Sequence, residues 1–140
     1  EIMAAAEELG LNFRGALERR ANNTFAAHRV LAWAGTQNLE TPLQLALFDA
    51  YFGEAKTPAD PAVLREKAIE VGLDGDAAEA IARSDQYADE VRASEQRFME
   101  AGVNAVPAFI LDGRYLISGA QPADVLVDAL RQVAEENASR

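Results

Sequence analysis

Cysteine is the residue whose absence constrains this chain most. None of the 140 residues is a cysteine, and there is a single histidine, His28. Disulfides within these residues are therefore excluded, and a zinc site would lack its usual thiolate and imidazole ligands. We expect no resident metal and no cofactor. A chain without disulfides is compatible with a reducing cytoplasm, which is the location we expect.

An excess of basic residues and a long apolar run are also missing. The chain has 13 basic residues against 23 acidic ones, a formal net charge of −10. This balance opposes binding to nucleic acid, where Lys and Arg neutralise phosphates, and to anionic membranes. No apolar stretch approaches the ~18 residues needed to cross a bilayer. Neither nucleic acid nor a membrane is therefore an expected partner, while the 49% hydrophobic content is enough for a core.

The first nine residues have the sequence pattern of the end of a helix. Residues 1–9 have the apolar pattern of an amphipathic helix with no capping residue before it, and Gly10 is suited to the position after its end. There is no initiator Met and no signal-peptide pattern. We therefore expect the chain to be part of a longer protein. Residues 11–14 alternate apolar and polar side chains and are predicted as an edge strand, and residues 14–23 as a loop.

Helix-start signals recur along the middle of the chain. Each combines a capping side chain with a residue typical of the first turn. Gly72 and Gly102 are suited to helix ends. The predicted starts are at Asn23 or Thr24, at Thr41 with Pro42 and Gln44, at Asp60 with Pro61, at Asp76 with Glu79, and at Ser84 or Asp85.

The helix predicted after Pro42 carries apolar residues around much of its circumference, so we expect it to be well buried. These residues are Leu43, Leu45, Leu47, Phe48, Tyr51 and Phe52. Phe48, Tyr51, Phe52 and Trp33 could together line an apolar pocket, although packing in the core is the default interpretation.

Residues 102–121 are the most informative segment. An apolar run over 108–111 follows Pro107, then Asp112-Gly113, then a second run over 114–118. Asp-Gly between two such runs predicts a β-hairpin, because a type I′ turn needs positive φ at both central residues. A proline has no N–H for the ladder, so Pro107 should lie at the start of a strand or on an edge. The last helix should start at Gln121-Pro122.

The run over 108–111 is continuously apolar, which is typical of a strand covered on both faces. Two strands cannot form such a sheet. Further strands would come from a preceding segment of a longer protein, or from a second copy of the chain in a homodimer.

Three strings carry a family resemblance: NTFAAHRVLAWAG at 23–35, SDQYADEVRASE at 84–95 and GVNAVPAFILDGRYLISGAQ at 102–121. Together they resemble the DsbA superfamily, in its FrnE-like, 2-hydroxychromene-2-carboxylate isomerase-like branch. The resemblance implies an α/β, mostly helical fold, in which a helical insertion is joined to the C-terminal ββα half of a thioredoxin-like fold. The implied parts are residues 1–14 (helix end and edge strand), 15–102 (helical insertion) and 103–140 (ββα).

The resemblance also implies a site. Pro107 matches the cis-proline of the family's catalytic site, and the backbone of Val106, with Ala105 beside it, would bind an extended thiol or disulfide substrate. Gln121 would contact a ligand at the sheet edge, although an N-cap role fits it equally well. The redox Cys-x-x-Cys pair of the family has no counterpart among these residues.

Three functions are compatible with these features. The first is a portion of a FrnE-type thiol–disulfide oxidoreductase acting on a protein or small-thiol substrate, inactive as this chain alone because exchange needs a thiolate. The second is part of a glutathione-dependent isomerase, with serine at the nucleophile position. The third is a redox-dead binding or dimerisation module. For Asn23, Thr24 and His28, a capped helix with a partly exposed histidine is the favoured interpretation over a site.

Overall fold

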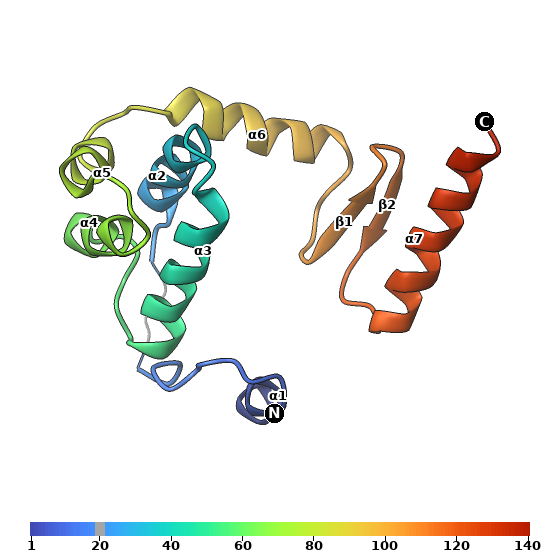
Figure 1. Cartoon of the computed structure of the whole chain (residues 1–140), viewed down its shortest axis with the longest axis horizontal. Helices are drawn as coiled ribbons and strands as arrows, with labels where there is room; N and C mark the ends of the chain where they lie inside the picture. The colour runs from blue at the N-terminus through green and yellow to red at the C-terminus, as the bar shows by residue number, and fades with distance from the viewer. Residues whose placement is uncertain (19–21) are drawn as a thin grey trace. The chain divides into compact units, whose positions relative to one another are not determined.

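The computed structural model describes residues 1–18 and 22–140, and the chain forms two compact units, Glu1–Arg92 and Ala93–Arg140. The first unit is helical and the second contains a two-stranded sheet (Figure 1). The predicted mostly helical α/β class is therefore confirmed. Part of the loop predicted over 14–23 lies outside the described residues, and the predicted division at residues 14 and 102 stays a prediction.

Short helices build the first unit around an apolar core. Val30, Leu43 and Leu64, which lie on three successive α-helices, are completely buried. The elements are α1 (Ile2–Glu8), α2 (Phe25–Gly35), α3 (Glu40–Phe48), the π-helix η1 (Asp49–Gly53), α4 (Pro61–Glu70), α5 (Gly75–Ala82) and the first turn of α6 (Ala88–Glu100).

The predicted burial of the helix after Pro42 is only partly right. Leu43 and Leu47 are buried in the core, but Leu45 is 58% exposed and Phe48 is 50% exposed. One stripe of α3 therefore packs against its neighbours, and the other apolar side chains lie at the surface. The spacing of apolar residues does not reveal how many neighbours a helix has.

The segment 11–14 is not a strand, contrary to the prediction. The ring of Phe13 stacks on that of Phe52, with centroids 4.6 Å apart, and the Gly15 N–H donates to the carbonyl of Phe52 at 2.8 Å. Alternation alone cannot make a strand, because a strand needs a partner for its backbone. Here the segment packs on a helix end instead. Gly15 is required there, since a Cβ would lie 2.4 Å from the backbone nitrogen of Ala55.

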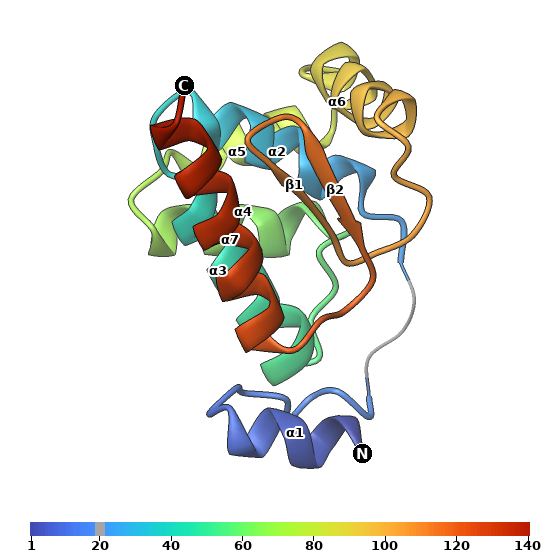
Figure 2. The same cartoon turned by 90° about the vertical axis from the view of Figure 1, so that its right-hand side faces the viewer.

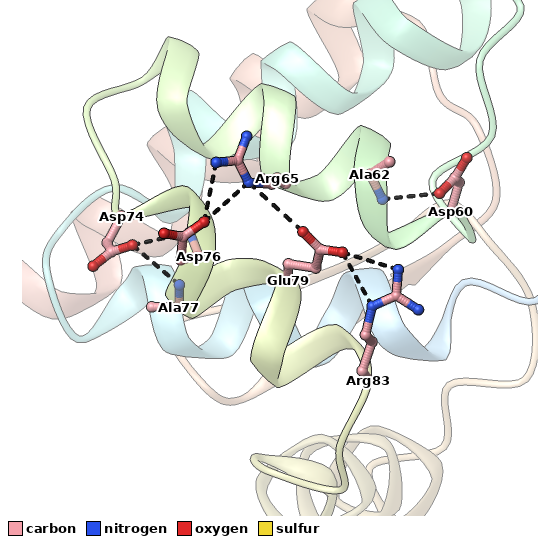
Figure 3. A network of polar contacts seen from close by, with 8 residues as sticks. All are labelled: Asp60, Ala62, Arg65, Asp74, Asp76, Ala77, Glu79 and Arg83. Carbon is pink, nitrogen blue, oxygen red and sulfur yellow. Dashed lines mark hydrogen bonds and ion pairs between the residues drawn. The ribbon is translucent and has the colours of Figure 1, made fainter.

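Ion pairs join α4 to α5, which lie side by side (Figure 1). The Arg65 guanidinium extends from α4 to the carboxylates of Asp76, at 3.0 Å, and Glu79, at 3.6 Å (Figure 3). Arg83 donates to Glu79 from the other side, at 2.9 Å. These side chains lie at the surface, so the pairs contribute orientation more than stability.

The second unit contains the rest of α6, strand β1 (Ala108–Leu111), strand β2 (Tyr115–Ser118) and helix α7 (Ala123–Ala138). The strands are antiparallel, with Ala108 opposite Ser118 and Leu111 opposite Tyr115. In the turn, Asp112 and Gly113 have φ of 52° and 64°, and the Arg114 N–H donates to the Leu111 carbonyl at 3.0 Å. The predicted Asp-Gly hairpin is therefore confirmed.

Helix α7 lies beside this hairpin (Figure 2). Its last turns are bound to the turn region, since Arg114 donates to Asn137 at 2.7 Å and Tyr115 donates to Glu136. The Asn137 amide and the Arg114 guanidinium also bind Asp112 and lower the pKa of its carboxyl group. Polar contacts thus orient the helix on the hairpin.

Residues 1–18 and 22–140 contain no helix that is both long and apolar enough to cross a membrane. Within the same residues, no three His, Asp or Glu side chains converge as metal ligands would.

Candidate functional site

The candidate loop begins where α6 ends. Gly102 has φ of +88°, its N–H donates to Met99, and the Val103 N–H donates to Phe98, a Schellman ending that satisfies two terminal carbonyls. The predicted helix end at Gly102 is therefore confirmed. The chain then leaves the helix as the exposed stretch of residues 104–107.

Pro107 lies directly before β1, as expected of a residue without an N–H. Its carbonyl accepts from the Gly119 N–H at 2.8 Å, which extends the pairing by one residue beyond Ala108 and Ser118. The Val106–Pro107 peptide bond is cis. Pro107 carries no group that can act as acid, base or nucleophile, so a role of this residue in a reaction would be to position other groups.

Ala105 and Val106 present free backbone. Val106 is 87% exposed. Among the described residues, no hydrogen-bond partner is found for the N–H or C=O of either residue. Strand β1 pairs only with β2 in the same part of the chain. Free donors and acceptors leading into an unpaired strand edge can add an extended peptide by β-augmentation.

Gln121 is exposed between β2 and α7. The N-cap position of α7 is Pro122, whose carbonyl accepts from Val125 at 3.1 Å, and no side chain caps the helix. The N-cap role considered for Gln121 is therefore wrong, because Pro122 lies between it and the first helical residue, Ala123. Its role as a ligand contact stays a prediction.

The loop contains no ionisable side chain between Val103 and Pro107. It can bind and orient a substrate through its backbone, but it cannot supply a proton or an electron pair for covalent chemistry. The reactive group of any thiol reaction must therefore come from elsewhere.

A second place for a ligand lies within the helical unit. Phe48, Tyr51 and Phe52 line a cavity together with His28 and Thr24, whereas Trp33 packs against the core. The pocket considered in the sequence analysis thus exists without Trp33. Gln44 was missed there as a pocket residue, since its position in a predicted capping box offered a sufficient explanation.

Residues 1–131 match the model of the DSBA-like thioredoxin domain family, and the chain therefore belongs to this family. A solved crystal structure, that of a probable DsbA oxidoreductase from Streptomyces coelicolor, is similar to this chain with a TM-score of 0.88 and 36% sequence identity. The match covers 95% of this chain and 57% of the other, so the chain spans little more than half the length of that relative. No curated protein matches the sequence.

Proposed function

We propose that these residues form part of a FrnE-type thiol–disulfide oxidoreductase, in which residues 105–107 bind the substrate. The family match over residues 1–131 carries this proposal. The free backbone groups of Ala105 and Val106 support it, because an extended segment flanking a thiol or disulfide could pair with them. The substrate would be a protein or a small thiol, the location the cytoplasm, and Gln121 a further contact.

The chemistry requires a thiolate that attacks one sulfur of a disulfide, forming a mixed disulfide and releasing the other sulfur as a thiolate. These 140 residues contain no cysteine. In this proposal the attacking thiolate comes from a part of the protein outside them, and the present chain supplies substrate binding.

The first experiment is to read the coding sequence upstream of Glu1 and to assay the extended protein for insulin reduction. A Cys-x-x-Cys motif with turnover supports the proposal. A serine without cysteine, with glutathione-dependent isomerase activity, would replace it by the isomerase function. If the extended protein has neither motif and neither activity, the remaining function is the redox-dead binding module. The 140-residue chain alone is the negative control, and turnover by it would contradict a thiol mechanism.

The loop itself is tested in the extended protein by Val106→Pro, which removes the backbone N–H, and by Val106→Ala, which keeps it. We expect the first variant to lose about tenfold or more in kcat/KM, the value of a lost hydrogen bond to substrate, and the second to stay near wild type. Circular dichroism checks the fold of both. Equal activities of the two variants would remove backbone pairing at Val106 from the proposal.

A further inference from the structure

The cavity in the helical unit has a volume of about 260 Å³. It is lined by residues of α2, α3 and η1 and by Pro58. Its floor is formed by the buried side chains of Ala27, Leu31 and Leu47. All of these residues belong to the first unit, so the cavity is a property of that unit alone.

Aromatic rings form the wall of the cavity. The ring of Phe52 lies 6.2 Å from that of Phe48 and 4.9 Å from that of Tyr51, the second pair edge to face. Phe48 remains 50% exposed although it borders the cavity. Tyr51 and Phe52 belong to a π-helical turn, a rare conformation that recurs at functional sites. The wall is therefore largely aromatic, and a further aromatic group could pack against it.

The rim is polar but contains no carboxylate among the described lining residues. It carries the hydroxyl of Thr24, the imidazole of His28 and the amide of Gln44, all on exposed residues. Elsewhere the chain is rich in acid, with 23 acidic residues. A cation would find no counter-ion at this rim, and an anion would approach a protein of net charge −10. An uncharged group with a hydrogen-bonding atom suits the rim.

The size of the cavity limits its occupant. Pockets for drug-sized ligands usually have about 300–1,000 Å³. A cavity of about 260 Å³ is suited to one or two fused rings and is too small for a dinucleotide or a folded segment. We propose that this cavity binds a small uncharged aromatic molecule carrying one polar group. The proposal does not rest on thiol chemistry, and it goes beyond the function proposed above.

The test is a titration of the 140-residue protein with 2-naphthol, followed by ¹H–¹⁵N NMR. We expect saturable shifts centred on the amides of α2, α3 and η1, which line the cavity. 2-Naphthalenesulfonate, which has the same rings and a negative charge, should bind about tenfold more weakly, because the net negative charge of the protein repels it. Equal or tighter binding of the sulfonate would overturn the assignment of an uncharged ligand.

Two exposed apolar residues of α3 provide a matched pair of variants. Phe48 lines the cavity and Leu45 does not. Phe48→Ala should weaken 2-naphthol binding by about tenfold, the value of one good aromatic contact, whereas Leu45→Ala should leave it unchanged. The Gln44→Leu variant should bind naphthalene as wild type does but 2-naphthol more weakly.

The proposal would also be overturned by the absence of a saturable shift, by shifts spread over the exposed apolar residues of the second unit, or by equal affinities of the Phe48→Ala and Leu45→Ala variants. Tighter binding of a short peptide with one aromatic side chain than of 2-naphthol would also overturn it, since the occupant would then be a polypeptide.

Discussion

Arg29 is a buried cation that binds carbonyl groups. It is 6% exposed, and its guanidinium donates to the carbonyls of Ile81 and Ser84 and, at 3.1 Å, to that of Ala82. These acceptors lie at and just after the end of α5, where the last carbonyls of a helix lack intrahelical partners. The negative end of the helix dipole adds to the attraction. Arg29 thus joins α2 to α5.

We predict that Arg29→Met, which keeps the apolar stem, lowers the free energy of unfolding by about 2–4 kcal/mol, because charged hydrogen bonds are lost and the buried carbonyl of Ala82 loses its donor. Arg83→Met is the control. Arg83 pairs with Glu79 on the surface of α5, and its loss should cost about 0.5 kcal/mol or less. Urea unfolding measures both, and equal costs would show that the buried contacts of Arg29 contribute little.

A cluster of charges surrounds Lys67. Its side chain is 4% exposed and contacts Glu70 at 2.9 Å and Glu54 at 3.0 Å. Burial opposes the charge of Lys67, but the hydrogen bonds that its ammonium group donates to Glu70 and Glu54 outweigh this effect, so the pKa of Lys67 is raised. Hydrogen bonds from Lys56 and then Lys67 lower the pKa of Glu54 below its ordinary 4.5. The cluster ties the segment after η1 to α4.

The lowered pKa of Glu54 predicts a pH dependence. A carboxyl group whose pKa is lower in the folded state stabilises the protein above its ordinary pKa, and this contribution is lost as the pH falls through the folded value. Glu54→Gln should therefore cost about 0.5–1 kcal/mol at pH 7, a small figure because Glu54 is solvent-screened. The difference from wild type should shrink below pH 4.5.

Urea unfolding from pH 7 to pH 3 checks this dependence. Glu95→Gln, at an exposed position of α6 without an ion pair among the described residues, is the control and should show little difference at any pH. A difference for Glu54→Gln that does not change between pH 7 and pH 3 would contradict the ionic explanation.

At the scale of elements, some helix starts are predicted correctly from the local sequence and others are not. Asp60 caps α4 as predicted, accepting from the Ala62 N–H at 2.8 Å (Figure 3). The start predicted at Asp76 is wrong, because Asp74 caps α5 through the N–H groups of Asp76 and Ala77. Asp76 pairs with Arg65 instead. Two aspartates lie close together at this helix start, and the local sequence does not show which of them caps the helix.

The start predicted at Thr41 is also wrong. Helix α3 begins at Glu40, with Leu39 at the N-cap position and no capping side chain. Pro42 is accommodated as the third helical residue, because the first N–H groups of a helix have no intrahelical acceptor. The proline therefore marks the first turn without defining which residue opens it.

The cap of α5 can be tested. Asp74→Ala should lower the free energy of unfolding by about 1 kcal/mol, because two N–H groups at the helix start lose their acceptor. Asp76→Ala removes only a surface contact to Arg65 and should cost about 0.5 kcal/mol or less. Thermal or urea unfolding of both variants checks the order. A larger cost for Asp76→Ala would favour the capping box predicted from the sequence.

At the scale of the whole molecule, the two units differ in burial. The first contains a cluster of buried side chains from α2 to α5. In the second, no residue from Ala93 to Arg140 is fully buried, and Ile110 and Leu116 on the strands are 37% and 40% exposed. The continuous apolar run of β1 is thus not covered on both faces by the described residues. An isolated two-stranded sheet is marginal in water, and the expectation of further strands stays a prediction.

We therefore predict that hydrogen exchange distinguishes the units in this chain. Amides of α2, α3 and α4 should exchange slowest, and those of β1 and β2 at least about tenfold faster, because local opening requires little free energy where few contacts are buried. Native-state exchange followed by NMR measures this. Equal protection in the hairpin and in the helical core would mean that this hairpin is covered by another chain or copy.

The sequence alone predicts features that depend only on neighbouring residues. The Asp112-Gly113 turn, the Asp60 cap and the helix end at Gly102 were all predicted, because each depends on a few adjacent residues and their allowed φ values. The strand predicted over 11–14 and the burial of Leu45 were wrong. Both depend on neighbours that are distant along the chain.

Some features of the candidate sites can likewise be predicted from the sequence, and others require the tertiary structure. Residue types and order alone identify the loop around Val106 and Pro107, exclude a thiol among these residues and point to the family, because these properties need no coordinates. The free backbone of Val106, the partners of Arg29 and the cavity beside Phe48 required the fold. Burial and pairing are properties of segments that meet in space, and helical periodicity does not say which segments meet.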